Sequence, residues 1–228
     1  MTPSFLSDQF DTMYYVPSYR AWFFSQDLRP AYEFHRHFLQ HLQHRRSARR
    51  WILKAPTHMF ALPTLLSVYP DALFVQTHRA PLEAVASVSS LVTILRRIFS
   101  DVVDPFTVGR DALRYWSETL TGFLEERERL PARRICDLDY LEIRHDPIAA
   151  VRSVYKYFGW SLSRDVEKQM RVVLGNEPRE QRGRHRYNLS QFGLETADGE
   201  AFTTYCERFG LSYPVTEPAE SAEALVSK

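Results

Sequence analysis

The 228-residue sequence predicts an α/β domain in three layers, in which a parallel sheet lies between flanking helices. Three short apolar segments, at 50–54, 73–77 and 134–138, have the length and the residue types of buried strands. Longer segments, whose apolar residues recur three and four positions apart, alternate with them and are typical of helices. Strands that are joined by helical crossovers run parallel, so this alternation indicates a parallel sheet.

The first part of the chain is expected to hold one helix and one strand. Residues 1–30 are aromatic and interrupted by prolines, and we expect them to be irregular. A helix is expected over 31–44, where Phe and Leu residues recur at every fourth position. The strand 50–54 follows and ends at a cation, and a leucine-rich helix begins after it near Thr57.

The second strand, 73–77, leads into a helix over 81–97. Pro81 suits its first turn, because the N–H that proline lacks has no partner there. The remaining elements are three helices and the third strand, expected at 108–129, 148–158, 164–174 and 134–138. Residues 1–210 would form one domain, and 211–228, rich in Glu, Ala and Ser, are expected to be a disordered tail.

The composition excludes several classes of protein. Lys and Arg number 29 against 28 Asp and Glu, and this balance argues against a dedicated nucleic-acid binder. The 2 cysteines do not make a disulfide framework. The sequence contains no apolar run long enough for a transmembrane helix and does not begin like a signal peptide, so we expect a cytoplasmic protein.

Charged and ring-nitrogen side chains follow the first two predicted strands. Lys54 and His58 come after the first strand, and Arg79 follows the second, which feeds a helix that carries Ser87. Because ligands of open parallel sheets bind beyond the carboxyl ends of the strands, we expect these four residues to converge. A guanidinium beside a helix N-terminus suits a doubly charged anion, and a histidine can act as a base near neutral pH.

Two other clusters have plainer explanations. His37, His41 and His44 lie on one stripe of the first helix, but no Cys, Asp or Glu completes a metal site nearby. We therefore interpret them as a solvated helix face and expect no metal. The basic residues at 182–186 fit a loop over a nucleotide phosphate better than a nucleic-acid site.

The motifs resemble those of the PAPS-dependent sulfotransferases, PAPS being 3′-phosphoadenosine 5′-phosphosulfate. They are WILKAPTH at 51–58, YPDA at 69–72, THRAP at 77–81, CDLDY at 136–140, GRHRY at 183–187 and QFGL at 191–194. The order is consistent over about residues 30–195, and the bacterial branch of the family is the most similar. The resemblance implies a P-loop NTPase-like sulfotransferase fold and an enzyme that sulfates a hydroxyl group.

The resemblance also implies catalytic roles. His58 matches the base that takes the proton from the acceptor hydroxyl, and Lys54 matches a cation near the transferring sulfuryl group. Such a base contributes about 10²–10⁴-fold to the rate, and a fixed cation stabilises the charge that builds on the leaving group. The reaction requires no metal.

For the donor, the resemblance implies a set of binding residues. Arg79 and Ser87 match the pair that holds the 3′-phosphate, and Tyr140 matches a tyrosine near the adenosine. Arg182 and Gly183 resemble a late loop that closes over the same phosphate.

The sequence departs from the family in two places. Family members carry an early loop of the type P-R-[ST]-G-[ST]-T that wraps the 5′-phosphosulfate, whereas the first glycine of this chain is Gly109. We therefore expect the first strand and its loop to be missing. Ala80 stands where the family has an Asp that caps a helix, a loss of about 1 kcal/mol.

Several interpretations stay open. The chain is a PAPS-dependent sulfotransferase with a small-molecule, lipid or glycan acceptor, or it is a catalytically inactive remnant of that fold or an interaction module. For the loop, either the reading frame starts late, or the gene is a truncated remnant, or a complementing chain supplies it. A homo-oligomer is the other partner that we consider. A different nucleotide enzyme, such as a kinase, lacks support because no Gly-x-x-x-x-Gly-Lys loop occurs.

Overall fold

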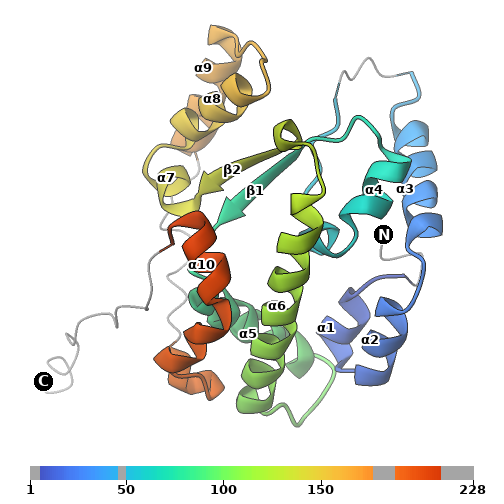
Figure 1. The fold of residues 1–228 in the computed structure, drawn as a ribbon, viewed down its shortest axis with the longest axis vertical. Coiled ribbons are helices and arrows are strands. Elements are labelled where there is room, and N and C mark those ends of the chain that lie inside the picture. Colours follow the sequence, from blue (N-terminus) through green and yellow to red (C-terminus); the bar gives the residue numbers. More distant parts are fainter. Residues whose placement is uncertain (1–5, 46–49, 177–187, 212–228) are drawn as a thin grey trace, which may run out of the picture.

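The computed structural model describes residues 6–45, 50–176 and 188–211. It is an α/β structure in which many helices surround a parallel sheet (Figure 1). The helices are α1 (Gln9–Tyr14), α2 (Pro17–Phe24), α3 (Arg29–Leu42), α4 (Leu62–Val68), α5 (Pro81–Arg97), α6 (Pro105–Glu128), α7 (Tyr140–His145), α8 (Pro147–Tyr157), α9 (Arg164–Asn176) and α10 (Thr203–Phe209). Short 3₁₀ helices are η2 (Pro56–Phe60), η3 (Ala132–Arg134), η4 (Leu189–Phe192) and η5 (Thr196–Phe202).

The sheet confirms the two later strands of the prediction. β1 (Phe74–His78) and β2 (Ile135–Asp139) are parallel and in register from the Phe74 and Ile135 pair to the His78 and Asp139 pair. Each begins one residue later than predicted. In Figure 1 the sheet lies at the centre, α1–α4 lie to its right and α7–α9 lie above and to the left.

The predicted strand 50–54 does not form. Residues 50–55 have no regular secondary structure, and Ile52 is 94% exposed. A strand needs hydrogen-bonded neighbours, and within the described residues β1 pairs with β2 and with nothing else. An apolar run without a partner strand stays irregular, so the described sheet has two strands instead of three.

The prediction that residues 1–30 are irregular is also wrong, because they contain α1 and α2. Helices of 6 and 8 residues are too short to show a clear apolar period. Contacts of the Asp11 side chain stabilise these two helices. Asp11 of α1 accepts a hydrogen bond from the Val16 N–H at 3.0 Å and forms an ion pair with Arg20 of α2.

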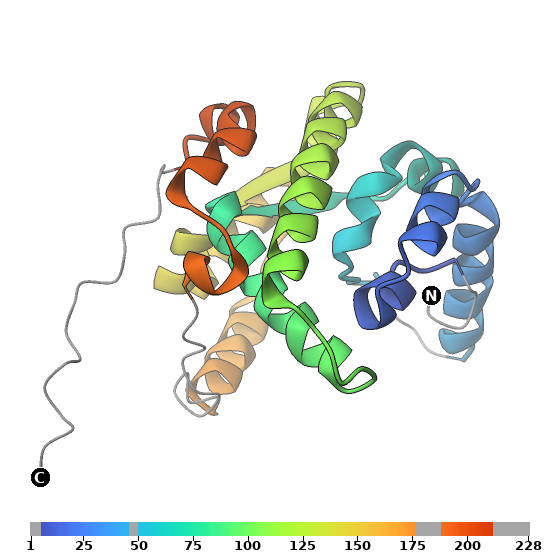
Figure 2. The same cartoon turned by 90° about the horizontal axis from the view of Figure 1, so that it is seen from below.

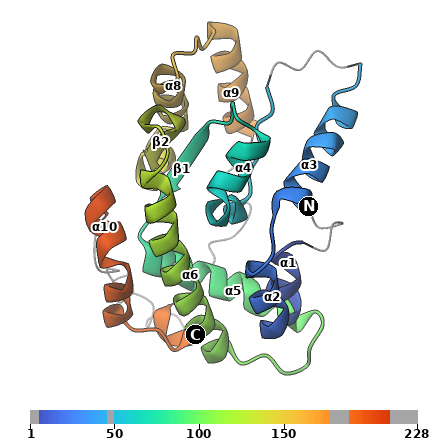
Figure 3. The same ribbon diagram turned by 45° about the vertical axis from the view of Figure 1, so that its right-hand side comes forward.

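The helix predicted over 31–44 is confirmed as α3, but its buried face is not the stripe that predicted it. Tyr32 and Leu39 are buried, while Phe34 and Phe38 are 53% and 50% exposed. Contact with α4 selects this face (Figure 3), and Tyr32 packs there with Leu65. The spacing of the apolar residues therefore predicts the helix correctly but predicts the wrong face of it to be buried.

The bounds of α5 agree with the prediction of 81–97, and α6 begins three residues before its predicted start. Asp104 caps α6 by accepting hydrogen bonds from the N–H groups of Phe106 and Thr107 at 3.1 and 3.0 Å. Gly109 of α6 lies against Phe192, so closely that a Cβ atom would come within 2.1 Å of its carbonyl oxygen. At this position the backbone of α6 therefore packs directly against the backbone of the segment 188–211.

Viewed from below, α5 and α6 separate two groups of elements (Figure 2). The C-terminal turns and α10 lie on one side, where Phe192, Leu194 and Phe202 join the core formed with Val85 and Ala112. The N-terminal helices α1–α3 lie on the other side. A cavity lies between these N-terminal helices and α5 and α6.

Candidate active site

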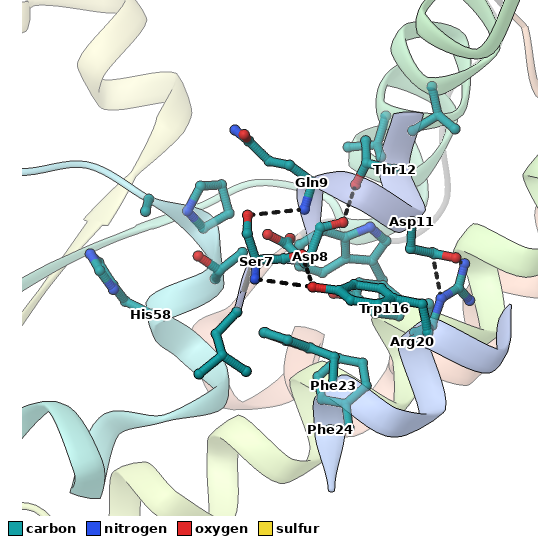
Figure 4. A pocket seen from close by; sticks show the side chains of 18 of the residues that line it. Ser7, Asp8, Gln9, Asp11, Thr12, Arg20, Phe23, Phe24, His58 and Trp116 are labelled. Atoms are coloured by element: carbon teal, nitrogen blue, oxygen red, sulfur yellow. Dashed lines mark hydrogen bonds and ion pairs between the residues drawn. The ribbon is translucent and has the colours of Figure 1, made fainter. Parts of the chain in front are cut away.

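The cavity has a volume of about 560 Å³. Helices α1–α3, the segment 53–58 and helices α5 and α6 form its walls (Figure 4). The apolar part of the wall combines aliphatic and aromatic side chains, and its larger members include Tyr19, Phe23, Phe24, Leu28, Tyr115 and Trp116. Such a lining favours an apolar ligand whose polar group meets a few polar side chains.

Lys54 and His58 both line this cavity, so the structure brings these two predicted residues together. Ala55 is extended, and Pro56 begins the single 3₁₀ turn η2 that carries His58. The His58 N–H donates to the Ala55 carbonyl at 3.3 Å, which closes the turn. The tight turn lets side chains only four positions apart reach the same space.

The two ring nitrogens of His58 have different surroundings. Nδ1 lies 3.1 Å from the hydroxyl oxygen of Tyr32, whereas Nε2 has no hydrogen-bond partner in the part of the chain that the structure describes. Burial, and next the neighbouring His35, lower the pKa of His58 below its usual 6.5. A neutral imidazole with one unoccupied nitrogen is the form that can accept a proton.

A second tyrosine–histidine pair lies beside the first. His35 Nδ1 is 2.7 Å from the hydroxyl oxygen of Tyr69, and burial lowers the pKa of His35. Tyr32 and His35 are three residues apart on α3 and therefore share one face of the helix. Tyr32 was not predicted from the sequence, because its partner His58 is 26 residues away. Its position one turn before His35 on the same helix face is the signal that could have pointed to it.

A buried ion-pair network forms another wall of the cavity. Arg20 donates to Asp11 at 2.6 Å and makes a two-pronged contact with Asp111 at 2.8 and 2.5 Å. Burial opposes the charge on Arg20, but the hydrogen bonds to Asp111 and Asp11 outweigh it and raise its pKa. Arg96 of α5 donates to the carbonyl oxygens of Asp11 and Thr12 at 3.0 and 3.2 Å. Together these contacts fix α1 and α2 to α5 and α6.

Arg79 and Tyr140 meet at the carboxyl edge of the sheet. Arg79 follows β1 and Tyr140 follows β2, and the guanidinium lies 5.1 Å from the centre of the tyrosine ring. Parallel pairing of the strands causes this contact, because it places their carboxyl ends side by side. Arg79 also pairs with Glu83 at 3.2 Å, one turn into α5.

The structure does not join all the predicted residues. Lys54 and His58 were expected to converge with Arg79 and Ser87, but neither of the latter two is among the described residues that line the cavity. Ser87 is half-buried on α5. Arg182 and Gly183 lie outside the described residues, as does the predicted tail from 212 onward. Ala80 begins α5 without a side-chain cap.

No group of three or more His, Cys, Asp or Glu side chains in 6–45, 50–176 and 188–211 could hold a metal. His37 and His41 are exposed on α3, whereas His44 is exposed in the turn after that helix and so does not continue the predicted stripe. No helix in those ranges is both long and apolar enough to cross a membrane.

The parallel sheet, the basic residue at its carboxyl edge and the histidine-bearing apolar cavity define an α/β protein with the layout of a group-transfer enzyme. A match to a protein family identifies which kind of group-transfer enzyme this is. Residues 1–164 match the model described as the sulfotransferase family, and the chain belongs to that family.

Several relatives are similar over most of this chain. It is 25% identical over 190 residues to the omega-hydroxy-beta-dihydromenaquinone-9 sulfotransferases Stf3 of Mycobacterium bovis and Mycobacterium tuberculosis, with 82% of this chain and 48% of theirs covered. The crystal structure of sulfotransferase STF9 from Mycobacterium avium superposes with a TM-score of 0.82 at 27% identity, covering 92% of this chain and 55% of that one. The crystal structure of sulfotransferase STF1 from Mycobacterium tuberculosis superposes with a TM-score of 0.76 at 33% identity, covering 87% of this chain and 51% of that one. The fold is therefore that of a sulfotransferase, and the chain spans about half the length of the curated relatives it matches.

Proposed function

We propose that this protein transfers the sulfuryl group of PAPS to the hydroxyl group of an apolar acceptor, with His58 as the base. Membership of the sulfotransferase family supports the reaction class. The observation that carries the proposal is that Nε2 of His58 has no hydrogen-bond partner among the described residues and lies in a cavity that Lys54 also lines.

In the proposed step the acceptor oxygen attacks sulfur, and the bond between sulfur and the bridging oxygen of PAPS breaks. The electron pair of that bond leaves with the 5′-phosphate of 3′-phosphoadenosine 5′-phosphate, abbreviated PAP. The hydroxyl proton goes to Nε2 of His58, because a neutral alcohol attacks poorly while it keeps its proton. Lys54 would stabilise the charge that develops on the transferring group and on the leaving oxygen.

Arg79 and Tyr140 are the proposed contacts of the donor's nucleotide end. A guanidinium can grip a phosphate with two parallel hydrogen bonds, and its contact with the Tyr140 ring orients it. A bound phosphate would compete with Glu83 for Arg79. Ser87, Arg182 and Gly183 remain proposed donor contacts on the strength of the family resemblance.

We propose that the protein acts with a partner, either a complementing chain or a second copy of itself, that adds to the sheet beside the donor site. Within the described residues β1 pairs along one edge only, and its other edge could receive a further strand. Light scattering with PAP present tests this partner: a monomer that binds PAP as well as an assembly does would contradict it.

The proposed acceptor is a lipid-like alcohol. Tyr19, Phe23, Phe24 and Trp116 give an aromatic surface to the cavity that His58 also lines, which suits an apolar body that ends in a hydroxyl group. The curated relatives are named for omega-hydroxy-beta-dihydromenaquinone-9, and a hydroxylated, lipid-like compound of that kind agrees with the proposed class of acceptor. Both cysteines are buried and free, which agrees with a reducing, cytoplasmic setting.

Calorimetric titration with PAP tests the donor site without requiring turnover. We expect binding by the wild-type chain and a loss of at least about tenfold in affinity for Arg79→Ala, because a charge-assisted contact to phosphate is removed. Arg110→Ala is the matched control, since Arg110 is exposed and pairs with Asp198. Equal affinities of the Arg79 variant and the wild type would refute the donor assignment, and a folded chain that does not bind PAP would favour an inactive remnant.

A further inference from the structure

Two tyrosine–histidine pairs join α3 to η2 and to the end of α4. Tyr32 contacts His58 at 3.1 Å, and His35 contacts Tyr69 at 2.7 Å. Each pair also places its two rings near one another, with centroids 5.8 and 5.9 Å apart. Only the Tyr32 pair includes a residue that the proposed reaction uses.

Tyr32 is held firmly enough to act as a support. It is 2% exposed and packs in a core cluster with Ala61, Leu65 and Val68. Burial raises the pKa of its hydroxyl to about 12, so it stays protonated over the working pH range. Such a hydroxyl cannot serve as the proton's destination, but its oxygen has lone pairs that can accept a hydrogen bond.

We propose that Tyr32 is the positioning residue for His58: its hydroxyl oxygen accepts the Nδ1 proton and thereby turns Nε2 toward the cavity as the proton acceptor. This inference rests on the proposed function, because it assigns a support to the base of that reaction. Nδ1 is the nitrogen that Tyr32 contacts, and Nε2 is the nitrogen without a partner among the described residues. The proton of the acceptor hydroxyl goes to Nε2, while the Nδ1 proton stays in its hydrogen bond to Tyr32.

The contact matters most when His58 is charged. After it takes the proton, the ring is an imidazolium with both nitrogens as donors, and Nδ1 then needs an acceptor in a half-buried place. Hydrogen bonds to charged groups are worth more than those between neutral groups, so Tyr32 stabilises the imidazolium more than the imidazole. Loss of the hydroxyl therefore makes His58 a weaker base.

The other groups near His58 act in the opposite direction. Burial lowers the pKa of His58, and His35, on the same face of α3 as Tyr32, lowers it further when it carries a charge. Lys54 lines the same cavity and contributes a positive charge there. Tyr69 holds His35 from the end of α4, and its hydrogen bond goes to His35 and not to His58. Tyr32 is thus the neighbour that favours the charged form of the base.

The test is an NMR titration of the His58 ring in the wild type, in Tyr32→Phe and in Tyr69→Phe. The first variant removes one hydroxyl and keeps the buried ring, and the second is a matched loss of a tyrosine–histidine hydrogen bond on the same helix face. We expect Tyr32→Phe to lower the pKa of His58 by about one unit and Tyr69→Phe to leave it unchanged. Where turnover is measured, Tyr32→Phe should lower kcat about tenfold with little change in the KM of the acceptor.

The outcomes separate this inference from the proposed function. An unchanged titration of His58 in Tyr32→Phe, or an equal shift in both variants, would overturn the positioning role whether or not the chain is active. A pKa shift confined to Tyr32→Phe supports the role even in a preparation that transfers no sulfuryl group, and the missing transfer would count against the proposed function alone.

Discussion

Replacement of Arg20 by methionine tests the network that anchors the cavity wall. The side chains of Arg20, Asp11 and Asp111 are 17%, 10% and 10% exposed, so their charges are largely removed from water. Arg20→Met keeps much of the side-chain volume and leaves two buried carboxylates facing each other. Breaking a buried ion pair by removing one partner costs about 3–5 kcal/mol, and we expect a loss of that size in the free energy of unfolding at pH 7.

The loss should depend on pH in a defined direction. Burial tends to raise the pKa of Asp111, but the hydrogen bond to Arg20 reverses this and holds it below the usual 3.8. The wild type therefore gains stability from Asp111 above that pH and loses the gain as the pH falls. In the variant, only Arg114 and Arg96 still oppose the effect of burial on the pKa of Asp111, so protonation relieves the repulsion more readily and the difference in stability shrinks between pH 7 and pH 4.

Urea unfolding at the two pH values measures both effects. Arg110→Met is the control, since Arg110 is 58% exposed and its pair with Asp198 should be worth only about 0.2–1 kcal/mol. Adding Asp111→Asn to the Arg20 variant should restore part of the loss, because one stranded charge is removed. A cost of Arg20→Met no larger than that of the control, or one that grows toward pH 4, would refute the reasoning.

Three further predictions concern single positions. Gly109→Ala should destabilise the fold by more than about 2 kcal/mol, because its Cβ would meet the Phe192 carbonyl oxygen at 2.1 Å. Gly122→Ala in the same helix has open space around the new Cβ and should stabilise the fold by up to about 1 kcal/mol. Thermal unfolding of the two variants measures both effects. Ala80→Asp should stabilise α5 by about 0.5–1 kcal/mol by supplying the missing cap, and unchanged unfolding would show that Asp finds no cap geometry there. The pKa of His58 in the folded protein lies below 6.5, so the acid limb of the profile of kcat/KM against pH should also lie below pH 6.5. As the pH falls, the imidazole of His58 takes up its proton in the unfolded chain before it does so in the folded protein. The free energy of unfolding should therefore be unaffected by His58 above pH 6.5 and should decline below it. A limb above pH 7 would contradict the assignment.

Much of the fold could be predicted from the sequence where local signals and tertiary packing agree. Helix α5 has a proline in its first turn and a continuous apolar period, and its predicted and observed bounds coincide. The segment 50–54 has a strand's composition, but whether it forms a strand depends on a neighbour that the segment does not specify. Phe34 and Phe38 illustrate the same limit for helices, since contact with α4 and not the period decides which face is buried.

The candidate site divides in the same way. Lys54 and His58 are four positions apart, and one tight turn brings both to the cavity although the strand predicted before them does not form. Arg79 follows β1, as the rule for the carboxyl ends of parallel strands predicts, whereas Tyr140 was a candidate only through the family resemblance. The contacts that hold the cavity together link residues far apart in sequence. Arg20 and Asp111 are 91 positions apart, and no pattern in a single sequence signals such a pair.

The role of His58 is the central claim, and the transfer of labelled sulfuryl groups from PAPS to a long-chain alcohol tests it most directly. Wild type and His58→Ala are assayed side by side, with PAP affinity measured on the same samples. We predict a fall in turnover of at least about 100-fold with little change in PAP affinity, because the base is lost and the donor contacts remain. Equal turnover of the two proteins, or a wild type that binds PAP and transfers nothing to any alcohol, would contradict the account.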